Sequence, residues 1–443
     1  MNQRHMRAVA VATCLSLSLA ALACVLAPVS WSPDGKWIAF MHFLSKKKAD
    51  GQGEDVVGSE LWIVSPSPIE RRRLAVTSGT LSGPAWSADS KTVYFVEFEE
   101  TAGSKSAALK TSSLDGQVKA LARFAGVEDS GGGATASPAI APDGRRIAFV
   151  RDESSIAIVG SDGRQERIIE TEKPGTLRWS PNGQWLGVIS GDGDNAPAIR
   201  MVNAQTSETF TLDVRFRTMA WLPEGTRFVA VRMDSGDGGK KSFISVLERP
   251  TGPREVSSFP VDGTPAGPLA LARQGDRVYF AREEEGSRPP AICGLDLRDG
   301  KQRVLYETPG PVCAWAVSPD GHAVAFRESA PGDDSSIESF VGVLDVRATT
   351  EPIYLGVSDA QWAKVLESYV TRLKKIPTAN LTPQDEKQAA FILAQAERLL
   401  AAFRRDFPNS PQLAPSAAAI KEVRAALKQA GVSFSPEAGM PRW

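Results

Sequence analysis

Few residues in this 443-residue chain are of the types that carry out catalysis. Only three histidines occur, and His5 lies close to the N-terminus, which leaves His42 and His322 as candidate bases. A nucleophilic serine of the hydrolase type would need a Gly-x-Ser-x-Gly sequence, and the chain contains none. We therefore interpret both histidines as surface or packing residues. We expect no catalytic residues and predict that the protein is not an enzyme.

Metal and phosphate ligands are equally sparse. The run Asp192-Gly193-Asp194-Asn195 resembles the start of a calcium loop, but Ala196 occupies the next ligand position and no glutamate closes the loop. The run Gly131–Gly133 lacks the lysine and flanking elements of a phosphate loop. We interpret the first as a hairpin turn and the second as a flexible connection, and we expect no metal site and no cofactor.

The N-terminal segment has the pattern of an export signal. Arg4 and Arg7 precede an apolar stretch at 8–23 that ends in Ala21-Leu22-Ala23, a sequence typical of signal-peptidase cleavage. Cys24 follows, so the segment also resembles a loose bacterial lipobox. We predict a signal peptide over residues 1–23 and a periplasmic or lipid-anchored location outside the cytoplasm. Lipidation of Cys24, plain cleavage and an uncleaved membrane anchor remain alternatives.

Charge and cysteine content restrict the partners. With 51 basic and 52 acidic residues the chain is nearly neutral, which does not favour nucleic acid as a ligand. Besides Cys14 in the leader and Cys24 directly after it, the chain has Cys293 and Cys313. An oxidising compartment permits a disulfide between them, and two buried free thiols are the alternative.

One sequence pattern recurs seven times and predicts the fold. Each copy has an apolar pair, a tight turn and a short alternating apolar run, as in PVSWSPDGKWIAF at 28–40. The copies are 39 to 55 residues apart, close to the length of a four-stranded propeller blade. The seven anchor positions are Trp31, Trp86, Ile140, Trp179, Trp221, Leu271 and Val317. We predict a seven-bladed β-propeller over residues 24–357, with six blades and one degenerate copy as the alternative.

Pro-Asp-Gly sets the turn in each complete copy, because proline fixes φ, aspartate binds nearby backbone amides and glycine accepts a positive φ. The structural turn residues predicted on this basis are Asp34, Gly35, Asp143, Gly144, Asp320 and Gly321. The stretch Leu26–Trp31 precedes the first turn. We predict that it completes the last blade and so closes the ring without an exposed sheet edge.

The repeat WSPDGKWIAF at 31–40, with further copies at 140–149 and 317–326, resembles the repeats of the TolB-type (WD40-like PD40 repeat) propeller family. The resemblance covers roughly residues 27–355, and four copies depart from the Pro-Asp-Gly turn. It implies a non-catalytic extracytoplasmic scaffold that binds protein partners in the bacterial cell envelope. The alternative is a sensory or accessory propeller subunit of an envelope peptidase, hydrolase or transport system.

From Ser358 the apolar period changes from 2 to 3.6 and predicts a helical appendage of about three helices over 358–443. Ser358-Asp359-Ala360-Gln361 has the pattern of a capping box, and Thr382-Pro383 that of a second helix start. A third helix is expected at about 416–430. The run Phe407–Pro411 resembles the turn of a single tetratricopeptide repeat, but one repeat does not make a solenoid, so we favour a packed appendage.

The expected partner site lies on one face of the ring. Loops that join second to third strands, such as Phe43–Glu60 and Glu97–Ala107, are long and varied, whereas the turns on the opposite face are short. We predict that a protein partner docks on the long-loop face of a monomer, with the membrane contacted only through the N-terminus; tolerated insertions are the alternative. The candidate contact residues are Lys46, Lys47, Lys48, Glu97, Glu99 and Glu100.

Overall fold

The computed structural model describes residues 29–47, 54–101, 104–125, 137–152, 154–190, 199–212, 216–236, 239–248, 252–283, 290–308, 312–329, 339–347, 352–379 and 381–434. Four sequence predictions lie outside these residues: the signal peptide at 1–23 with Cys24, Lys48, the Gly131–Gly133 run and the Asp192–Asn195 turn.

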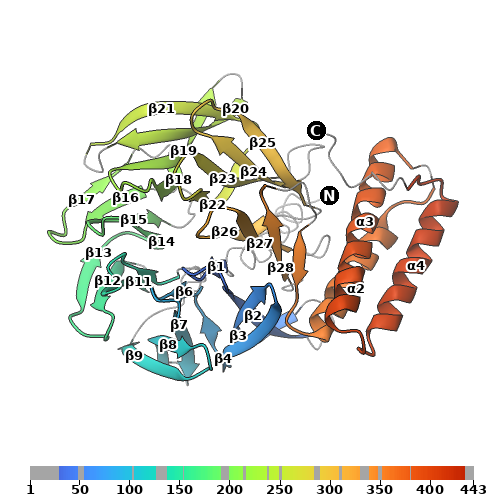
Figure 1. The fold of residues 1–443 in the computed structure, drawn as a ribbon, viewed down its shortest axis with the longest axis horizontal. Coiled ribbons are helices and arrows are strands. Elements are labelled where there is room, and N and C mark those ends of the chain that lie inside the picture. Colours follow the sequence, from blue (N-terminus) through green and yellow to red (C-terminus); the bar gives the residue numbers. More distant parts are fainter. Residues whose placement is uncertain are drawn as a thin grey trace, which may run out of the picture.

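Seven antiparallel sheets surround one axis, and each sheet uses consecutive strands of the chain (Figure 1). Blade 1 contains β1 (Val29–Trp31), β2 (Ile38–Lys47), β3 (Glu54–Pro66) and β4 (Ile69–Thr77). Blade 2 contains β5 (Thr80–Leu81), β6 (Ala85–Trp86), β7 (Thr92–Thr101), β8 (Ser104–Ser113) and β9 (Val118–Ala125). Blade 3 contains β10 (Ala139–Ile140), β11 (Arg146–Asp152), β12 (Ser155–Gly160) and β13 (Arg167–Glu170).

The second half of the ring repeats this order. Blade 4 contains β14 (Pro174–Trp179), β15 (Trp185–Ser190), β16 (Ile199–Asn203) and β17 (Thr209–Thr211). Blade 5 contains β18 (Phe216–Trp221), β19 (Arg227–Gly236), β20 (Gly239–Glu248) and β21 (Arg254–Val261). Blade 6 contains β22 (Pro265–Leu271), β23 (Arg277–Arg282), β24 (Ala291–Asp296) and β25 (Gln302–Glu307). Blade 7 contains β26 (Val312–Val317), β27 (Ala323–Ser329), β28 (Ser339–Asp345) and β29 (Ile353–Leu355). The fold is a seven-bladed β-propeller, as the repeat predicts.

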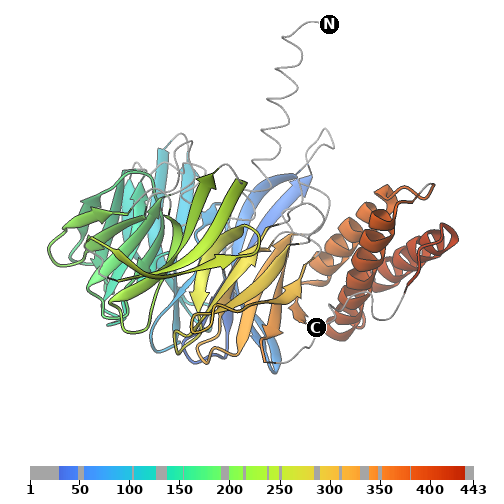
Figure 2. The same ribbon diagram turned by 90° about the horizontal axis from the view of Figure 1, so that it is seen from above.

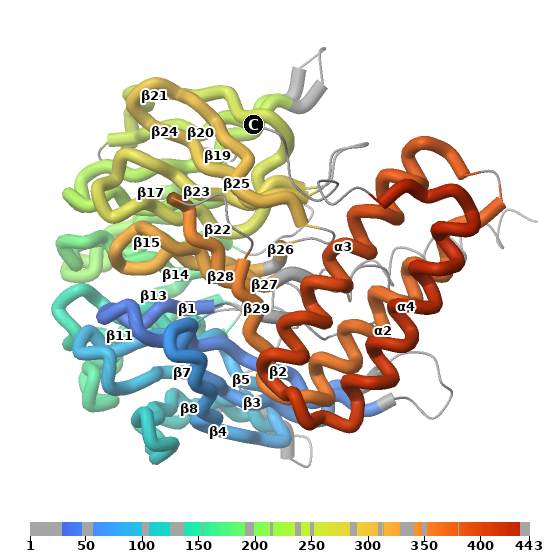
Figure 3. Tube along the Cα trace, turned by 45° about the vertical axis from the view of Figure 1, so that its right-hand side comes forward, coloured from blue at the N-terminus to red at the C-terminus, as the bar shows by residue number. Residues whose placement is uncertain are grey.

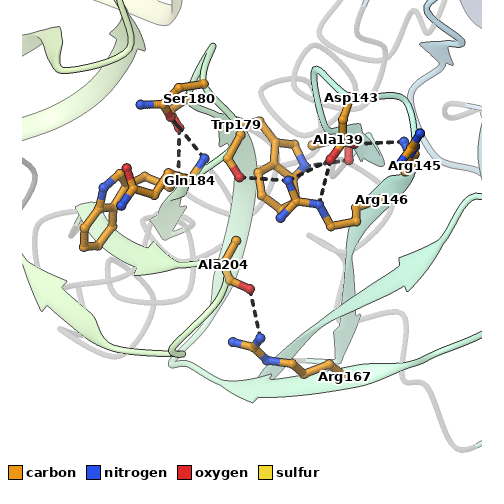
Figure 4. Close-up of polar contacts among 12 residues, drawn as sticks. Ala139, Asp143, Arg145, Arg146, Arg167, Trp179, Ser180, Gln184 and Ala204 are labelled. Carbon is orange, nitrogen blue, oxygen red and sulfur yellow. Dashed lines mark hydrogen bonds and ion pairs between the residues drawn. The ribbon is translucent and has the colours of Figure 1, made fainter.

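Each anchor position is the last residue of the innermost strand of its blade. The indole N–H of every anchor tryptophan donates to a backbone carbonyl of the preceding blade. The four bonds are Trp31 to Ala316 at 3.1 Å, Trp86 to Ser30 at 3.0 Å, Trp179 to Ala139 at 2.9 Å and Trp221 to Arg178 at 2.9 Å. Figure 4 shows the Trp179 bond beside Arg146, whose guanidinium lies 4.9 Å from the Trp179 ring centroid. The anchors therefore join neighbouring blades as well as filling the space between them.

The turns behave as the Pro-Asp-Gly sequence predicts. Ser32 donates its hydroxyl to Asp34 at 2.6 Å, and the same serine oxygen accepts the Trp37 N–H at 2.9 Å. Gly35 and its counterparts in the other complete copies have φ values from +67° to +76°. Each turn also meets its neighbour: a Cβ on Gly275 would lie 2.6 Å from the Pro223 ring, and one on Gly225 would lie 3.1 Å from the Asn182 amide nitrogen.

The predicted closure of the ring is wrong. Residues 29–31 form β1, which pairs only with β2 of its own blade, and blade 7 is built wholly from β26–β29. Residues 26–28 lie outside the described part. Blade 7 supplies all four of its strands from consecutive sequence, so no position is left for an N-terminal strand. Side chains close the ring instead: the Trp31 indole reaches Ala316, and the buried Arg327 guanidinium donates to the Met41 carbonyl at 2.5 Å.

Three helices follow the ring: α2 (Asp359–Lys375), α3 (Pro383–Asp406) and α4 (Leu413–Gln429). Ser358 and Thr382 are their predicted N-caps. The Gln361 side chain accepts from Val357, one residue before the position that a capping box would use. Helix α4 begins three residues earlier than predicted, because Pro415 falls in its first turn, where no backbone N–H is needed.

The helical appendage, defined as α2–α4, packs beside blades 7 and 1 (Figure 3). Trp362 and Phe403 are fully buried and stack with centroids 6.1 Å apart. Gln395 of α3 accepts a hydrogen bond from Tyr306 of blade 6 at 3.1 Å, and Tyr306 also bonds Tyr354 of blade 7 at 2.8 Å. One apolar core therefore continues from blades 5–7 into the helices.

The appendage also contacts blade 1 directly. Arg71 of β4 donates to the Gly356 carbonyl at 2.5 Å and forms an ion pair with Asp406, whose side chain is 1% exposed. The same guanidinium lies 5.3 Å from the Phe407 ring centroid. Lys364 of α2 donates to the Ser45 hydroxyl of β2 at 2.9 Å. The helices thus bridge the two blades at which the ring closes.

Candidate functional site

Three pairs of strands extend well beyond the others on one face of the ring. These hairpin arms, defined as β2–β3, β7–β8 and β19–β20, use strands of 10 to 13 residues, whereas β15 and β16 of blade 4 have 6 and 5. Figure 2 shows the arms of blade 1 (blue), blade 2 (cyan) and blade 5 (yellow-green) projecting on the same side. We call this side the hairpin face.

The predicted long loops at Phe43–Glu60 and Glu97–Ala107 are therefore largely strands. Register pairs such as Lys46 with Asp55 and Glu99 with Ser106 continue the blade ladders outward. The sequence pattern predicts shorter strands, because polar residues interrupt the apolar alternation once the strands leave the core. Ordered arms give this face a more rigid surface than loops of the same length would.

The arm of blade 1 carries exposed apolar side chains. Val56 and Val57 of β3 are 47% and 48% exposed. The other large apolar residues with comparable exposure are on the outermost strands of their blades: Val76, Val118, Ile168, Val256 and Ile353. The Val56–Val57 pair is thus the one such group that lies on an arm, among the described residues. Lys46, which is exposed, lies on the partner strand of this arm.

The acidic residues of the blade 2 arm differ in accessibility. Glu97 is buried, and its carboxylate forms an ion pair with Lys110. Glu99 is 41% exposed at its side chain and lies 3.8 Å from the same ammonium group. Burial, with a smaller contribution from Arg123, lowers the pKa of Lys110. Glu97 is therefore paired within the arm, and its role as a partner contact stays a prediction.

The partner-contact role of the other candidates on the two arms stays a prediction. Lys47 and Glu100 lie toward the outer ends of β2 and β7, and Lys46, the neighbour of Lys47 on β2, is exposed. The turn residues have a structural role, as expected: Asp143 and Asp320 accept backbone N–H bonds from Arg145 and His322. Val56 and Val57 are not among the contact residues predicted from the sequence. A pair of adjacent valines inside a supposed polar loop is the signal that could have identified them.

His42, His322 and Cys293 lie in different parts of the fold. His42 is buried on β2 opposite Glu60, and His322 is an exposed turn residue. Cys293 is a free, buried thiol, so it is not bonded to Cys313, and burial raises the pKa of Cys293 to about 11. Such a thiol is a poor nucleophile at neutral pH. Within the described ranges, no group of three or more His, Cys, Asp or Glu side chains could hold a metal ion.

Comparisons with known proteins assign no family to this chain. No protein-family model matches the chain, and a search of curated proteins finds no match. Among solved structures, hydrazine synthase from Kuenenia stuttgartiensis aligns with a TM-score of 0.48 and 15% identity, covering 72% of this chain and 94% of that one. TolB from Acinetobacter baumannii aligns with a TM-score of 0.38 and 18% identity, covering 63% and 62%.

At these levels of similarity the identification of the fold rests on the strand topology. The residues that the structure describes include no helix long and apolar enough to cross a membrane.

Proposed function

We propose that this protein is a non-catalytic, extracytoplasmic β-propeller that binds a protein partner in the bacterial cell envelope through its hairpin face. The observation that carries the proposal is the exposed Val56–Val57 pair on an ordered arm that projects beyond the ring. Apolar side chains exposed together on a rigid element are typical of interaction sites. The export pattern of residues 1–24 supports the location.

The charges on the hairpin face support a protein partner whose surface carries both apolar and charged groups. Lys46 lies on the blade 1 arm and Glu99 on the neighbouring blade 2 arm, so both signs of charge occur on the hairpin face. A small apolar centre with a charged rim is the usual arrangement of a protein interface. The nearly balanced charge of the whole chain argues against a polyanionic ligand.

The test is capture of envelope proteins on mature protein that begins at Cys24. We expect the double variant Val56→Ser/Val57→Ser to lose about tenfold or more in affinity for the partner, because two apolar side chains no longer pack against it. Val118→Ser is the matched control, since Val118 is 46% exposed on the outermost strand β9. A partner retained equally by the double variant and by the control would refute the hairpin face as the site.

The same experiment addresses the alternative function. A captured peptidase, hydrolase or transporter subunit whose retention depends on Val56 and Val57 would identify an accessory role for the propeller. Recovery of the full-length protein from the cytosol would refute the extracytoplasmic location.

A further inference from the structure

One ring of equivalent residues in the propeller contains a single exception. The residue that precedes each anchor lies on the innermost strand, one position before its end. In six blades this residue is alanine or serine, and in blade 4 it is arginine. The seven residues are Ser30, Ala85, Ala139, Arg178, Ala220, Ala270 and Ala316.

These positions lie on the strands that surround the axis of the ring, and solvent reaches several of them. Ser30, Ala85, Ala139, Ala270 and Ala316 are partly exposed although they belong to the strands closest to the axis. Propellers characteristically have a channel along this axis, and small side chains around it keep it open. Arg178 is also partly exposed, while enough protein surrounds it to disfavour its charged form.

Packing between blades 4 and 5 determines where the Arg178 side chain can lie. Arg178 is paired with Gly187 on β15, so both residues face blade 5. Met219 of blade 5 occupies the space over Gly187: a Cβ at Gly187 would lie 2.7 Å from its sulfur. Met219 is fully buried. Met219 thus fills the space beside Gly187, and the partial exposure of Arg178 on the innermost strand leads us to infer that its guanidinium extends toward the axis of the ring.

Arg178 has no ionic partner in the described part of the chain. Its side chain makes no hydrogen bond or ion pair there, whereas the buried Arg282 and Arg327 both have partners. Burial is the cause that lowers the pKa of Arg178. A charge surrounded by protein is normally paired, because desolvation without compensation is costly. A lone guanidinium in a channel is thus suited to a ligand that supplies the opposite charge.

We propose that Arg178 makes the axial channel a binding site for a carboxylate. The planar guanidinium can donate two parallel N–H bonds to one carboxylate group, and the ring of small residues leaves the space for it. The carboxylate belongs to a free small acid or to an acidic side chain of a bound polypeptide. This site is separate from the Val56–Val57 pair, and it goes beyond the proposed function.

The test uses isothermal titration of the mature protein at low ionic strength with two probes, succinate and a blocked Gly-Gly-Glu-Gly-Gly peptide. We expect one site in the wild type. Arg178→Met should weaken binding about tenfold to a hundredfold, and Arg178→Lys less, because lysine keeps the charge but loses the paired donors. Arg303→Met on the outermost strand β25 is the control for loss of one positive charge and should bind as the wild type does.

The two probes distinguish the sources of the carboxylate. Tighter binding of the peptide assigns the site to a polypeptide side chain, and equal or tighter binding of succinate assigns it to a small acid. Labelling with phenylglyoxal provides a second measurement on the wild type, in which Arg178 should react and be protected by the better probe. Equal affinity in wild type and Arg178→Met, or no binding of either probe at millimolar concentration, would overturn the proposal.

The variants also separate this proposal from the proposed function. Val56→Ser/Val57→Ser should leave the affinity for succinate unchanged, since those residues lie on an arm and not at the channel. Loss of partner capture with intact succinate binding, or the reverse, therefore identifies which of the two proposals fails.

Discussion

Single tryptophans hold neighbouring blades together in this ring. Trp31, Trp86, Trp179 and Trp221 each bond the carbonyl of the residue just before the preceding anchor, whereas Ile140, Leu271 and Val317 have no such donor. The three aliphatic anchors rely on packing alone. The sequence repeat shows which residue types occupy the anchors, but it does not reveal that the indole N–H reaches the next blade.

The indole bond of Trp179 should contribute measurably to stability. We expect Trp179→Phe to lower the free energy of unfolding by about 1–2 kcal/mol more than Trp315→Phe, because it also leaves the Ala139 carbonyl without its donor. Trp315 is a matched control: it is 4% exposed, and its Nε1 has no hydrogen-bond partner in the described residues. Urea unfolding of both variants measures the difference. Equal losses would mean that the indole bond contributes nothing net.

The turn carboxylates link stability to pH. The Ser318 hydroxyl is the largest cause that holds the pKa of Asp320 below its ordinary value, and the His322 backbone N–H acts in the same direction against burial. A lowered native pKa means that the stabilisation is present above about pH 4 and is lost as the pH falls through the native value. We expect Asp320→Asn to reduce the acid slope of the unfolding free energy between about pH 5 and pH 3. An unchanged slope would contradict this role.

Polar residues were harder to place from sequence than apolar ones. The anchors and the Pro-Asp-Gly turns were predicted because their spacing repeats. The sequence predicts an exposed carboxylate at Glu97, because carboxylates are normally exposed and no sequence pattern shows that Lys110 lies across the hairpin from it. Arg178 is the one large residue among alanines and a serine when the repeats are aligned, but the sequence does not show that these positions surround the axis.

At the scale of elements, strand existence was predicted better than strand length. The apolar alternation identifies the part of β7 that packs in the core, while the outer part of the β7–β8 arm is held by its ladder and by the Lys110–Glu97 pair. The helix starts at Ser358 and Thr382 were predicted correctly because cap chemistry is local. The docking of the appendage depends on contacts distant in sequence, such as Arg71 with Asp406, which no local pattern shows.

The Arg71–Asp406 pair should anchor the appendage to blade 1. We expect Arg71→Met to lower stability by about 2 kcal/mol, because the buried Asp406 then keeps only Arg405 as an ionic partner. The double variant Arg71→Met/Asp406→Asn should lose less than the sum of the two single changes. Urea unfolding gives the energies, and limited proteolysis reports loosening of α2–α4. Additive losses would show that the two side chains act independently.

At the scale of the whole molecule, the number of blades follows from counting anchors, but the way the ring closes does not. The sequence shows that apolar residues precede the first turn and cannot show whether they pair with β2 or with the last blade. Because β28 already pairs with β29 at Val343–Ile353, the last blade is complete without them. Closure therefore depends on side chains such as Arg327 and Trp31.

Closure by side chains can be tested at Arg327. We expect Arg327→Met to lower the free energy of unfolding by about 2 kcal/mol, since the Met41 carbonyl loses a charged donor. Arg303→Met on the rim should change it little. Tryptophan fluorescence and circular dichroism should still report one coincident transition. Two separate transitions would show that blades 1 and 7 unfold apart from the rest of the ring.

The first and last blades of this ring share no strand, so among the described residues only side-chain contacts join the two ends of the propeller. This junction lies between blades 7 and 1. The segment that continues from blade 7 into the helices spans the junction and contacts Arg71 and Ser45 of blade 1. Because Ser45 belongs to the arm that carries Val56 and Val57, a load on that arm passes through Lys364 into α2. We therefore expect a force applied to the blade 1 arm to act on both the junction between blades 7 and 1 and the C-terminal helices.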